Sequence, residues 1–222
     1  MEYSLDFSWL GDAARLIGNG ALMTIFLIVV TAMLGTVISV LGAAGRRSRY
    51  AAMRSAVASY VELIRNTPFL AQLFFIYFGL PSLGLRLDAV IAAILAMTIN
   101  LAAYGIEIVG AGLDAVPAGQ REAGLTLGLR PHQIFVKIVL PQALKVIFPA
   151  LTSQIVITML ESAVVSQIAV RDLTYEADLL QARTFRSFET YLVVTLVYLF
   201  LSVGLRRLMI AGDRRFLPAG IR

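Results

Sequence analysis

Cysteine is absent from the 222-residue sequence, and histidine occurs only once, at position 132. Without cysteine the chain has neither a disulfide framework nor a thiolate metal site. His132 stands alone in a polar segment, so it is interpreted as a surface residue rather than a metal ligand. Charged residues are also scarce, at 15% of the chain. These absences exclude a disulfide-rich domain and a thiolate metal centre.

Three motifs of catalytic or nucleotide-binding proteins are missing as well. The sequence contains no G-x-x-x-x-G-K-[ST], so the chain is expected not to bind ATP itself. Neither H-E-x-x-H nor the G-x-S-x-G nucleophile elbow is present, which argues against an intramembrane hydrolase. The first fifteen residues hold Glu2, Asp6 and Asp12 against only Arg15, so no cleavable signal peptide is expected. The sequence therefore predicts a protein that is not an enzyme and binds no metal or cofactor itself.

Apolar residues, by contrast, are abundant: 59% of the chain is hydrophobic and the mean hydropathy is +0.81. A soluble domain of this size has no way to hide so much apolar surface from water, so a polytopic membrane protein is favoured. The net charge of +5 comes from arginines grouped beside hydrophobic runs, without a basic stripe of interleaved aromatics. The lipid bilayer, and not nucleic acid, is therefore the expected partner of this charge.

Five hydrophobic runs are long enough to cross the hydrocarbon core, which takes about twenty apolar residues in a helix. They cover approximately residues 20–44, 51–80, 89–113, 141–160 and 190–210. The second run is interrupted by Glu62, Arg65 and Pro68. No internal repeat or linker is evident, and five spans do not divide into two inverted halves. We therefore predict an all-α, polytopic membrane protein whose residues 1–222 form one transmembrane domain.

Lysine and arginine are concentrated on one side of this predicted arrangement. Residues 45–54 hold four arginines, and residues 114–145 hold four basic residues. The end of the last span and its tail add Arg206, Arg207, Arg214, Arg215 and Arg222. The positive-inside rule then places the N-terminus outside and the C-terminus in the cytoplasm. Residues 5–17 carry apolar side chains on one face, so they form either a helix in the outer interface or a poorly ordered terminus.

The connection at 116–141 is a polar segment that breaks the helical pattern between two spans. Residues 121–127 are predicted to form a short helix, and Gly128 permits a sharp turn out of it. The small residues Ala123 and Gly124 let a neighbouring backbone approach closely. Glu122 is expected to accept hydrogen bonds from backbone amides at a helix start. Such a compact element in water predicts a docking site for another protein, and an ordinary helix–turn–helix connection is the alternative.

Three blocks of sequence occur in a particular order and spacing. Residues 65–79 read R-N-T-P-F-L-A-Q-L-F-F-I-Y-F-G, residues 103–108 read A-Y-G-I-E-I, and residues 122–141 follow E-A-G-x3-G-x9-I-x-L-P. These blocks resemble the permease subunits of ABC-type polar amino-acid importers, the branch that carries histidine, glutamine, glutamate, arginine and opines. The resemblance extends over nearly the whole chain, from about residue 16 to residue 205, and this branch commonly has five spans per subunit.

The resemblance implies the membrane-spanning subunit of an importer in a bacterial inner (cytoplasmic) membrane. Two ATPase subunits, which hold the ATP and Mg, would dock on the coupling loops of two permease subunits. A periplasmic binding protein would deliver the amino acid. The residues of this sequence implied in coupling to the ATPase are Glu122, Ala123, Gly124, Leu127, Gly128 and Leu129.

Polar residues within the spans are candidates for the substrate path, because a charge inside a membrane is costly and usually has a partner. The candidates are Arg65, Asn66, Thr67, Glu107, Gln154, Glu161 and Ser162. Glu62, three residues before Arg65, is expected to neutralise it. This pair is either purely structural or part of the path. Pro68 is expected to open the backbone near Thr67 toward a cavity.

The third span, at 89–113, carries two of the polar residues at issue. Glu107 and Asn100 are suited either to interhelical hydrogen bonding or to substrate contact. Ala92, Ala96 and Asn100 recur every four residues and are expected to mark a packing face.

Two positions depart from the family pattern. Leu160 stands where the family often has Lys or Gln, and Gly110 stands where it frequently has arginine. Both departures favour a second permease subunit that is a non-identical homologue, with a copy of this chain as the alternative.

Other functions remain compatible with the residues alone. One is an ABC permease for another small solute, such as a metal chelate, a phosphonate or a sugar. Another is a passive channel or a structural membrane subunit, which needs no ATPase. The Arg-Asn-Thr-Pro block and the five-span layout favour amino acids as the transported substrate, a class that includes basic amino acids and opines. Selectivity is expected to rest largely with the binding protein.

Overall fold

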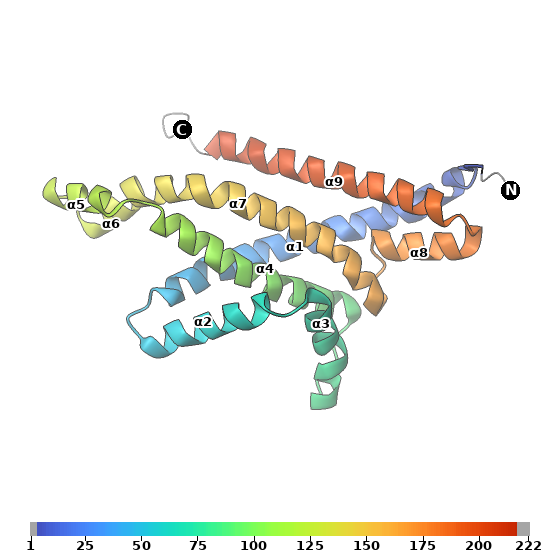
Figure 1. Ribbon diagram of the computed structural model, residues 1–222, viewed down its shortest axis with the longest axis horizontal. Helices are drawn as coiled ribbons and strands as arrows, with labels where there is room; N and C mark the ends of the chain where they lie inside the picture. Colours follow the sequence, from blue (N-terminus) through green and yellow to red (C-terminus); the bar gives the residue numbers. More distant parts are fainter. Residues whose placement is uncertain (1–3, 217–222) are drawn as a thin grey trace.

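The computed structural model describes residues 4–216, and every regular element in that range is helical, which confirms the predicted all-α class (Figure 1). The α-helices are α1 (Leu10–Arg46), α2 (Ala51–Arg65), α3 (Phe69–Phe74), α4 (Ala89–Asp114), α5 (Ala118–Thr126), α6 (Pro131–Ile134), α7 (Leu140–Glu161), α8 (Leu173–Thr184) and α9 (Ser187–Phe216). Wider π-helical turns at Phe75–Gly79 and Phe135–Val139 and tighter 3-10 turns at Leu80–Leu83 and Ser162–Ile168 extend these helices. Among residues used above, Glu2, Arg222 and the side chains of Arg214 and Arg215 lie outside the described part of the chain.

Four helices of the described residues are long and apolar enough to cross a membrane: Leu10–Arg46, Ala89–Asp114, Pro131–Ile168 and Ser187–Gly212. The predicted second span is a bent pair, in which Ala51–Arg65 and Phe69–Leu83 meet at 108°. In Figure 1, α3 accordingly leaves the line of α2 at a steep angle. Counted as one span, the pair brings the total to the predicted five.

The predicted fourth span, about residues 141–160, corresponds to α7, with Pro141 in its first turn, but the apolar helix extends beyond both predicted ends, over Pro131–Ile168. The helix already begins at Pro131 and continues through Pro141 into α7. Proline inside a helix removes a backbone hydrogen bond and crowds the preceding turn. The π-helical turn Phe135–Val139 directly precedes Pro141 and widens the helix at that point. A residue that predicted a helix start therefore lies within a longer helix.

Close packing of α1 against α4 forms the centre of the molecule. Small residues line this contact: Ser39 lies directly against Gly105, and a Cβ at Gly35 would come within 2.7 Å of the Leu101 side chain. Small side chains let two helix backbones approach closely in a membrane protein. On α4, Ala92, Ala96 and Asn100 are all buried, so the predicted packing face is confirmed.

An additional helix, α8, was not predicted from the sequence and lies at the opposite end of the molecule from α5 (Figure 1). Asp172 caps it by accepting a hydrogen bond from the Tyr175 amide at 2.9 Å, and Asp172 also accepts one from the Tyr198 hydroxyl on α9 at 3.1 Å. The Leu173 amide donates to Thr24 Oγ1 on α1 at 3.3 Å. Burial raises the pKa of Asp172 to about 6. Asp172 thus joins α8 to α9, and Leu173 joins α8 to α1.

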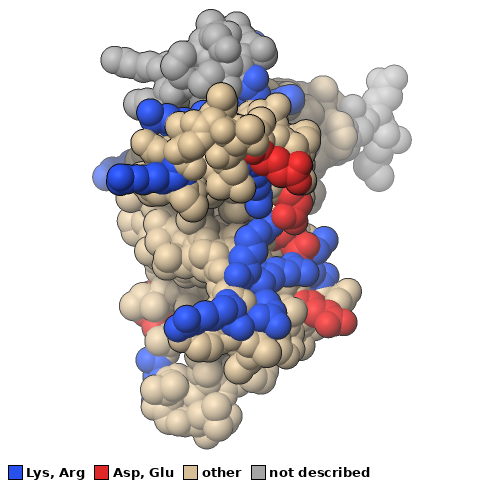
Figure 2. Space-filling model, turned by 90° about the vertical axis from the view of Figure 1, so that its left-hand side faces the viewer, with Lys and Arg blue, Asp and Glu red and all other residues tan. Residues whose placement is uncertain are grey.

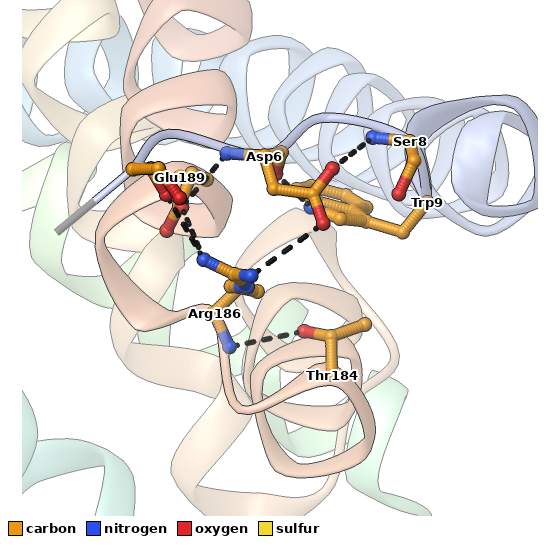
Figure 3. Close-up of polar contacts among 7 residues, drawn as sticks. Asp6, Ser8, Trp9, Thr184, Arg186 and Glu189 are labelled. Carbon is orange, nitrogen blue, oxygen red and sulfur yellow. Dashed lines mark hydrogen bonds and ion pairs between the residues drawn. The ribbon is translucent and has the colours of Figure 1, made fainter.

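The residues that precede α1 are fastened to the turn between α8 and α9 (Figure 3). The Asp6 amide donates to Glu189 Oε1 at 3.2 Å, and the Asp6 carboxylate lies 3.5 Å from the Arg186 guanidinium. Trp9 Nε1 donates to the Asp6 carbonyl at 3.0 Å. Hydrogen bonds from Ser8 lower the pKa of Asp6. These contacts exclude a poorly ordered terminus over residues 4–9, and the interfacial placement of this segment stays a prediction.

Candidate functional site

The predicted coupling loop contains the helix α5, which ends in a defined C-terminal cap. Gly128 has a φ of +74°, a left-handed conformation that glycine adopts at little cost. The Leu129 amide donates to the Gly124 carbonyl at 3.0 Å, and the Gly128 amide donates to the Leu125 carbonyl at 2.9 Å. This pair of bonds is the Schellman arrangement, which satisfies helix-end carbonyls. The predicted sharp turn at Gly128 is confirmed.

Gly124 is the residue at which α5 packs against the start of the fourth span. It is buried, and an added Cβ would lie 2.9 Å from Ile134 Cγ1 and 3.2 Å from Ile138 Cδ1. Gly124 therefore allows a close contact, but its neighbours are isoleucine side chains and not the neighbouring backbone that was predicted. Ala123, the other small residue, is exposed. Leu129 is partly buried and packs on the main core, which fixes the exit of the loop.

Two leucines are exposed on the otherwise polar outer surface of α5 and its cap. Leu125 is 58% exposed and Leu127 is 78% exposed. Glu122 lies beyond the first turn of α5 with an exposed side chain, and the cap that precedes the helix is Pro117, so the expected bond from Glu122 to helix-start amides is not formed. Exposed leucines beside a free carboxylate make a surface suited to a protein partner.

Basic residues gather at this same end of the molecule (Figure 2). A cavity of about 460 Å³ lies behind α5, between the ends of α1 and α4 and the start of the fourth span. Arg47, Asp114 and Arg121 are its charged lining residues. Arg47 Nη2 lies 2.7 Å from Asp114 Oδ1 and donates to the Gly110 carbonyl at 2.8 Å, so it ties the end of α1 to α4.

The break between α2 and α3 is held by side chains that bond to the freed backbone carbonyls. Asn66 Nδ2 donates to the Glu62 carbonyl at 2.8 Å, and Thr67 Oγ1 donates to the Leu63 carbonyl at 3.0 Å. Gln72 Nε2 donates to the carbonyls of Ile64 at 2.8 Å and Thr67 at 3.0 Å. A helix end within a membrane needs such partners because lipid supplies none. Asn66 and Thr67, predicted on the substrate path, therefore act first as caps of the break.

Gln72 is a residue that the sequence analysis missed, although it stands in the 65–79 block. Its side-chain oxygen accepts a hydrogen bond from Asn100 Nδ2 on α4 at 3.1 Å. Both residues are buried. The break in the second span is thereby attached to the central helix. The available signal was a lone amide in an otherwise apolar run.

A charged cluster occupies the space next to this break. Glu107 forms an ion pair with Arg46 of α1 and lies 3.8 Å from the Arg65 guanidinium of α2. The Arg65 guanidinium also lies over the Tyr104 ring, 5.3 Å from its centroid. The predicted neutralisation of Arg65 by Glu62 is wrong, because the ion pairs of the described residues join Arg65 to Glu107. The i, i+3 spacing places Glu62 on the same face of α2 as Arg65, but the tertiary contact with α4 supplies the carboxylate that forms the ion pair.

The cluster lines a cavity of about 440 Å³, whose wall includes Glu62, Arg65, Asn66, Tyr104 and Glu107. The remaining substrate-path candidates lie elsewhere. Gln154 is buried on α7, and the buried Ser162 hydroxyl donates to the Met159 carbonyl at 2.7 Å. Glu161 is partly buried, and one of its carboxylate oxygens has no hydrogen-bond partner among the described residues. The structure therefore divides the predicted path between the cavity and the far end of α7.

Comparisons with known proteins agree with these features. Residues 35–217 match the family described as binding-protein-dependent transport system inner membrane component. The arginine transport system permease protein ArtQ of Bacillus subtilis (strain 168) is 32% identical over 213 residues, which cover 96% of this chain and 97% of that protein. The probable glutamine ABC transporter permease protein GlnM of the same organism is 41% identical over 147 residues, covering 66% and 68%.

A solved structure has the same fold. The crystal structure of an amino acid ABC transporter with histidines aligns with a TM-score of 0.89 and 34% sequence identity, over 96% of this chain and 100% of that chain. Its likeness extends over the bent second span and the helical loop, since nearly the whole of both chains is matched. The chain therefore belongs to the family of binding-protein-dependent transport system inner membrane components.

Proposed function

We propose that this chain is the permease subunit of an ATP-driven importer of polar amino acids. The observation that carries the proposal is the rigidly capped helix α5, with Leu125 and Leu127 exposed, at the end of a bundle of membrane-crossing helices. The relatives named for glutamine and arginine transport support an amino acid as the cargo. Basic amino acids and opines fall within the same class of cargo.

The ATPase that drives transport is a separate chain in this proposal. The exposed residues Glu122, Ala123, Leu127 and Gly128 form its docking surface, and the less exposed Gly124 and Leu129 hold that surface against the rest of the chain. ATP and Mg bind to that partner. Because Ile134 and Ile138 pack directly against Gly124 without a gap, α5 and the fourth span are expected to move together as a rigid body. The chain spans a bacterial inner membrane, with the basic end that carries α5 on the cytoplasmic side and the N-terminus on the outer side.

The complex also contains a second permease subunit and a periplasmic binding protein. A non-identical second permease is favoured by Leu160, which brings no basic residue to the end of α7. The argument from Gly110 is weaker, because Arg47 of the same chain places a guanidinium 3.7 Å from the position of a Gly110 Cβ.

The experiment is uptake by proteoliposomes that contain the complete complex, with ATP enclosed and radiolabelled L-glutamine or L-arginine delivered by the binding protein. L127D is expected to lower uptake at least about tenfold and to release the ATPase during purification, because a central anchor of an interface contributes on the order of 2 kcal/mol. The matched control is L85D, since Leu85 is 60% exposed in the connection before α4. Uptake that persists without ATP in both variants would contradict the proposal and identify a passive channel.

A further inference from the structure

The cavity beside the helix break contains a cation, Arg65, that is held by one long ion pair, and an anion, Glu62, that has no ion pair among the described residues. The Arg65 guanidinium has only the Glu107 carboxylate at 3.8 Å and the Tyr104 ring as neighbours, and it makes no hydrogen bond among the described residues. Its side chain is 43% exposed and lines the cavity. Glu62 lines the same cavity, and its carboxylate has neither an ion pair nor a hydrogen bond within residues 4–216. Arg46, by contrast, is paired with Glu107.

Charges of both signs are therefore available on one turn of α2. A guanidinium with free N–H donors binds a carboxylate through two parallel hydrogen bonds. A carboxylate that is acceptor-only binds an ammonium group. The four charged residues of the cavity, Arg46, Arg65, Glu62 and Glu107, sum to zero, so a ligand of one sign leaves a charge unmatched. A molecule that carries one carboxylate and one ammonium matches the Arg65 N–H groups, which make no hydrogen bond among the described residues, and the Glu62 carboxylate.

The cavity continues toward the end of the molecule that carries α5. A second hollow of about 410 Å³ shares Arg46 and Glu107 with the first and reaches Asp114 at the end of α4. The cavity behind α5 in turn shares Arg47 and Asp114 with this hollow. Three neighbouring hollows between the helix break and the coupling helix thus share charged lining residues, and charges of both signs lie along that end of the molecule in Figure 2. Intramembrane charges that line a water-filled space are typical of a transport pathway.

We propose that Arg65 and Glu62 form a binding site for the α-carboxylate and α-ammonium groups of an amino acid as it leaves toward the cytoplasm. The site rests on the proposed importer function and adds to it a way of recognising any amino acid by its backbone charges. A volume of about 440 Å³ falls in the range of small-molecule sites, roughly 300–1,000 Å³. Recognition of the common groups leaves the side chain of the cargo unread, so one site serves cargoes of different side chains.

The test is equilibrium binding of radiolabelled L-glutamine and L-arginine to the complete complex in nanodiscs, without the binding protein. Two competitors separate the groups: the amino-acid amide lacks the carboxylate, and the N-acetyl amino acid lacks the ammonium. The wild type is expected to bind the intact amino acid about tenfold to a hundredfold more tightly than either competitor, since hydrogen bonds to charged groups are strong. R65Q is expected to lose the preference over the amide alone, and E62Q the preference over the N-acetyl compound alone.

R54Q and D12N are the matched controls, because Arg54 and Asp12 are exposed charges outside the cavity. Both controls are expected to keep both preferences. Three outcomes overturn the inference: no saturable binding of either probe, an equal loss of both preferences in R65Q and E62Q, or loss of the second permease from the complex in these variants. The last outcome identifies the cavity as a subunit interface. ATP-driven uptake that survives while the preferences do not change would refute this site and leave the importer function standing.

Discussion

Replacement of Gln72 by leucine is the most direct test of how the broken second span is held together. Gln72 and leucine are similar in size, so Q72L leaves little cavity and mainly removes hydrogen bonds. The Thr67 carbonyl loses its donor and Asn100 Nδ2 loses its acceptor, whereas the Ile64 carbonyl keeps the bonds from the Thr67 amide and hydroxyl. The two carbonyls lie at the break of a bent membrane-crossing pair, and Asn100 lies on α4 beside it.

The expected cost follows from the number of groups left without a partner. Each buried polar group that loses its hydrogen bond costs about 1–3 kcal/mol. Two such groups, the Thr67 carbonyl and Asn100 Nδ2, give about 2–6 kcal/mol, which lowers the melting temperature by roughly 5–20 °C in a chain of this length. Q142L is the matched control, because Gln142 Nε2 makes one hydrogen bond, to the Ile138 carbonyl at 2.8 Å. It is expected to cost about 1 kcal/mol.

The assay is thermal unfolding of the purified protein in nanodiscs, with amide hydrogen exchange followed over residues 64–72. Exchange in that segment is expected to accelerate in Q72L and to stay unchanged in Q142L. The additional variant N100L should cost less in a Q72L background than in the wild type, because the two side chains share one hydrogen bond. Equal stability of Q72L and Q142L, or fully additive effects of Q72L and N100L, would refute the reasoning.

Three further predictions concern the loop, the helix contact and the outer end. G128A is expected to destabilise the α5 cap by about 1 kcal/mol and to lower ATP-driven uptake, because Gly128 has a φ of +74°. The control G119A, at a helical site with open space, should be neutral or slightly stabilising in thermal unfolding. G105V is expected to cost at least about 1–3 kcal/mol in the same assay, because Gly105 faces Ser39 directly, while G204V on α9 meets open space and should be tolerated; equal effects would contradict the α1–α4 contact. The pKa of Asp172 is raised from 3.8 to about 6 in the folded state. Protonation of Asp172 therefore contributes about 3 kcal/mol to the free energy of unfolding below about pH 4, and this contribution is lost as the pH rises through 6. D172N, which keeps an N-cap acceptor, should therefore show a weaker decline than the wild type in unfolding measured from pH 4 to pH 7, and parallel curves would refute the assignment.

Much of the coupling loop was predictable because its structure depends on neighbours in the sequence. The left-handed turn at Gly128 and the close contact at Gly124 both follow from the absence of a Cβ. The role of Glu122 was not, since a carboxylate caps a helix only in its first turn. The helix begins at Ala118, so Glu122 comes too late to do so.

The charged cavity could be predicted only in part. A charged residue inside a hydrophobic run is visible in the sequence, so Arg65 and Glu107 were identified. Their partners, however, lie on helices that are distant in the sequence. Arg46 had been counted only as a basic residue at the end of a span, and Glu62 had been paired with Arg65 by helical spacing alone. The packing of α1 and α2 against α4 brings Glu107 to both arginines and leaves Glu62 facing the cavity.

The sequence by itself determined the membrane class, the positions of the hydrophobic runs, the break at Pro68 and the helical loop. These features depend on local composition, on backbone freedom and on the length needed to cross a bilayer. The tertiary structure alone decided the 108° bend, the long fourth span through Pro141, the partner of Arg65 and the attachment of α8 through Asp172. Each of these depends on contacts between residues that are distant in the chain, and such contacts stabilise the structure only after the helices have packed.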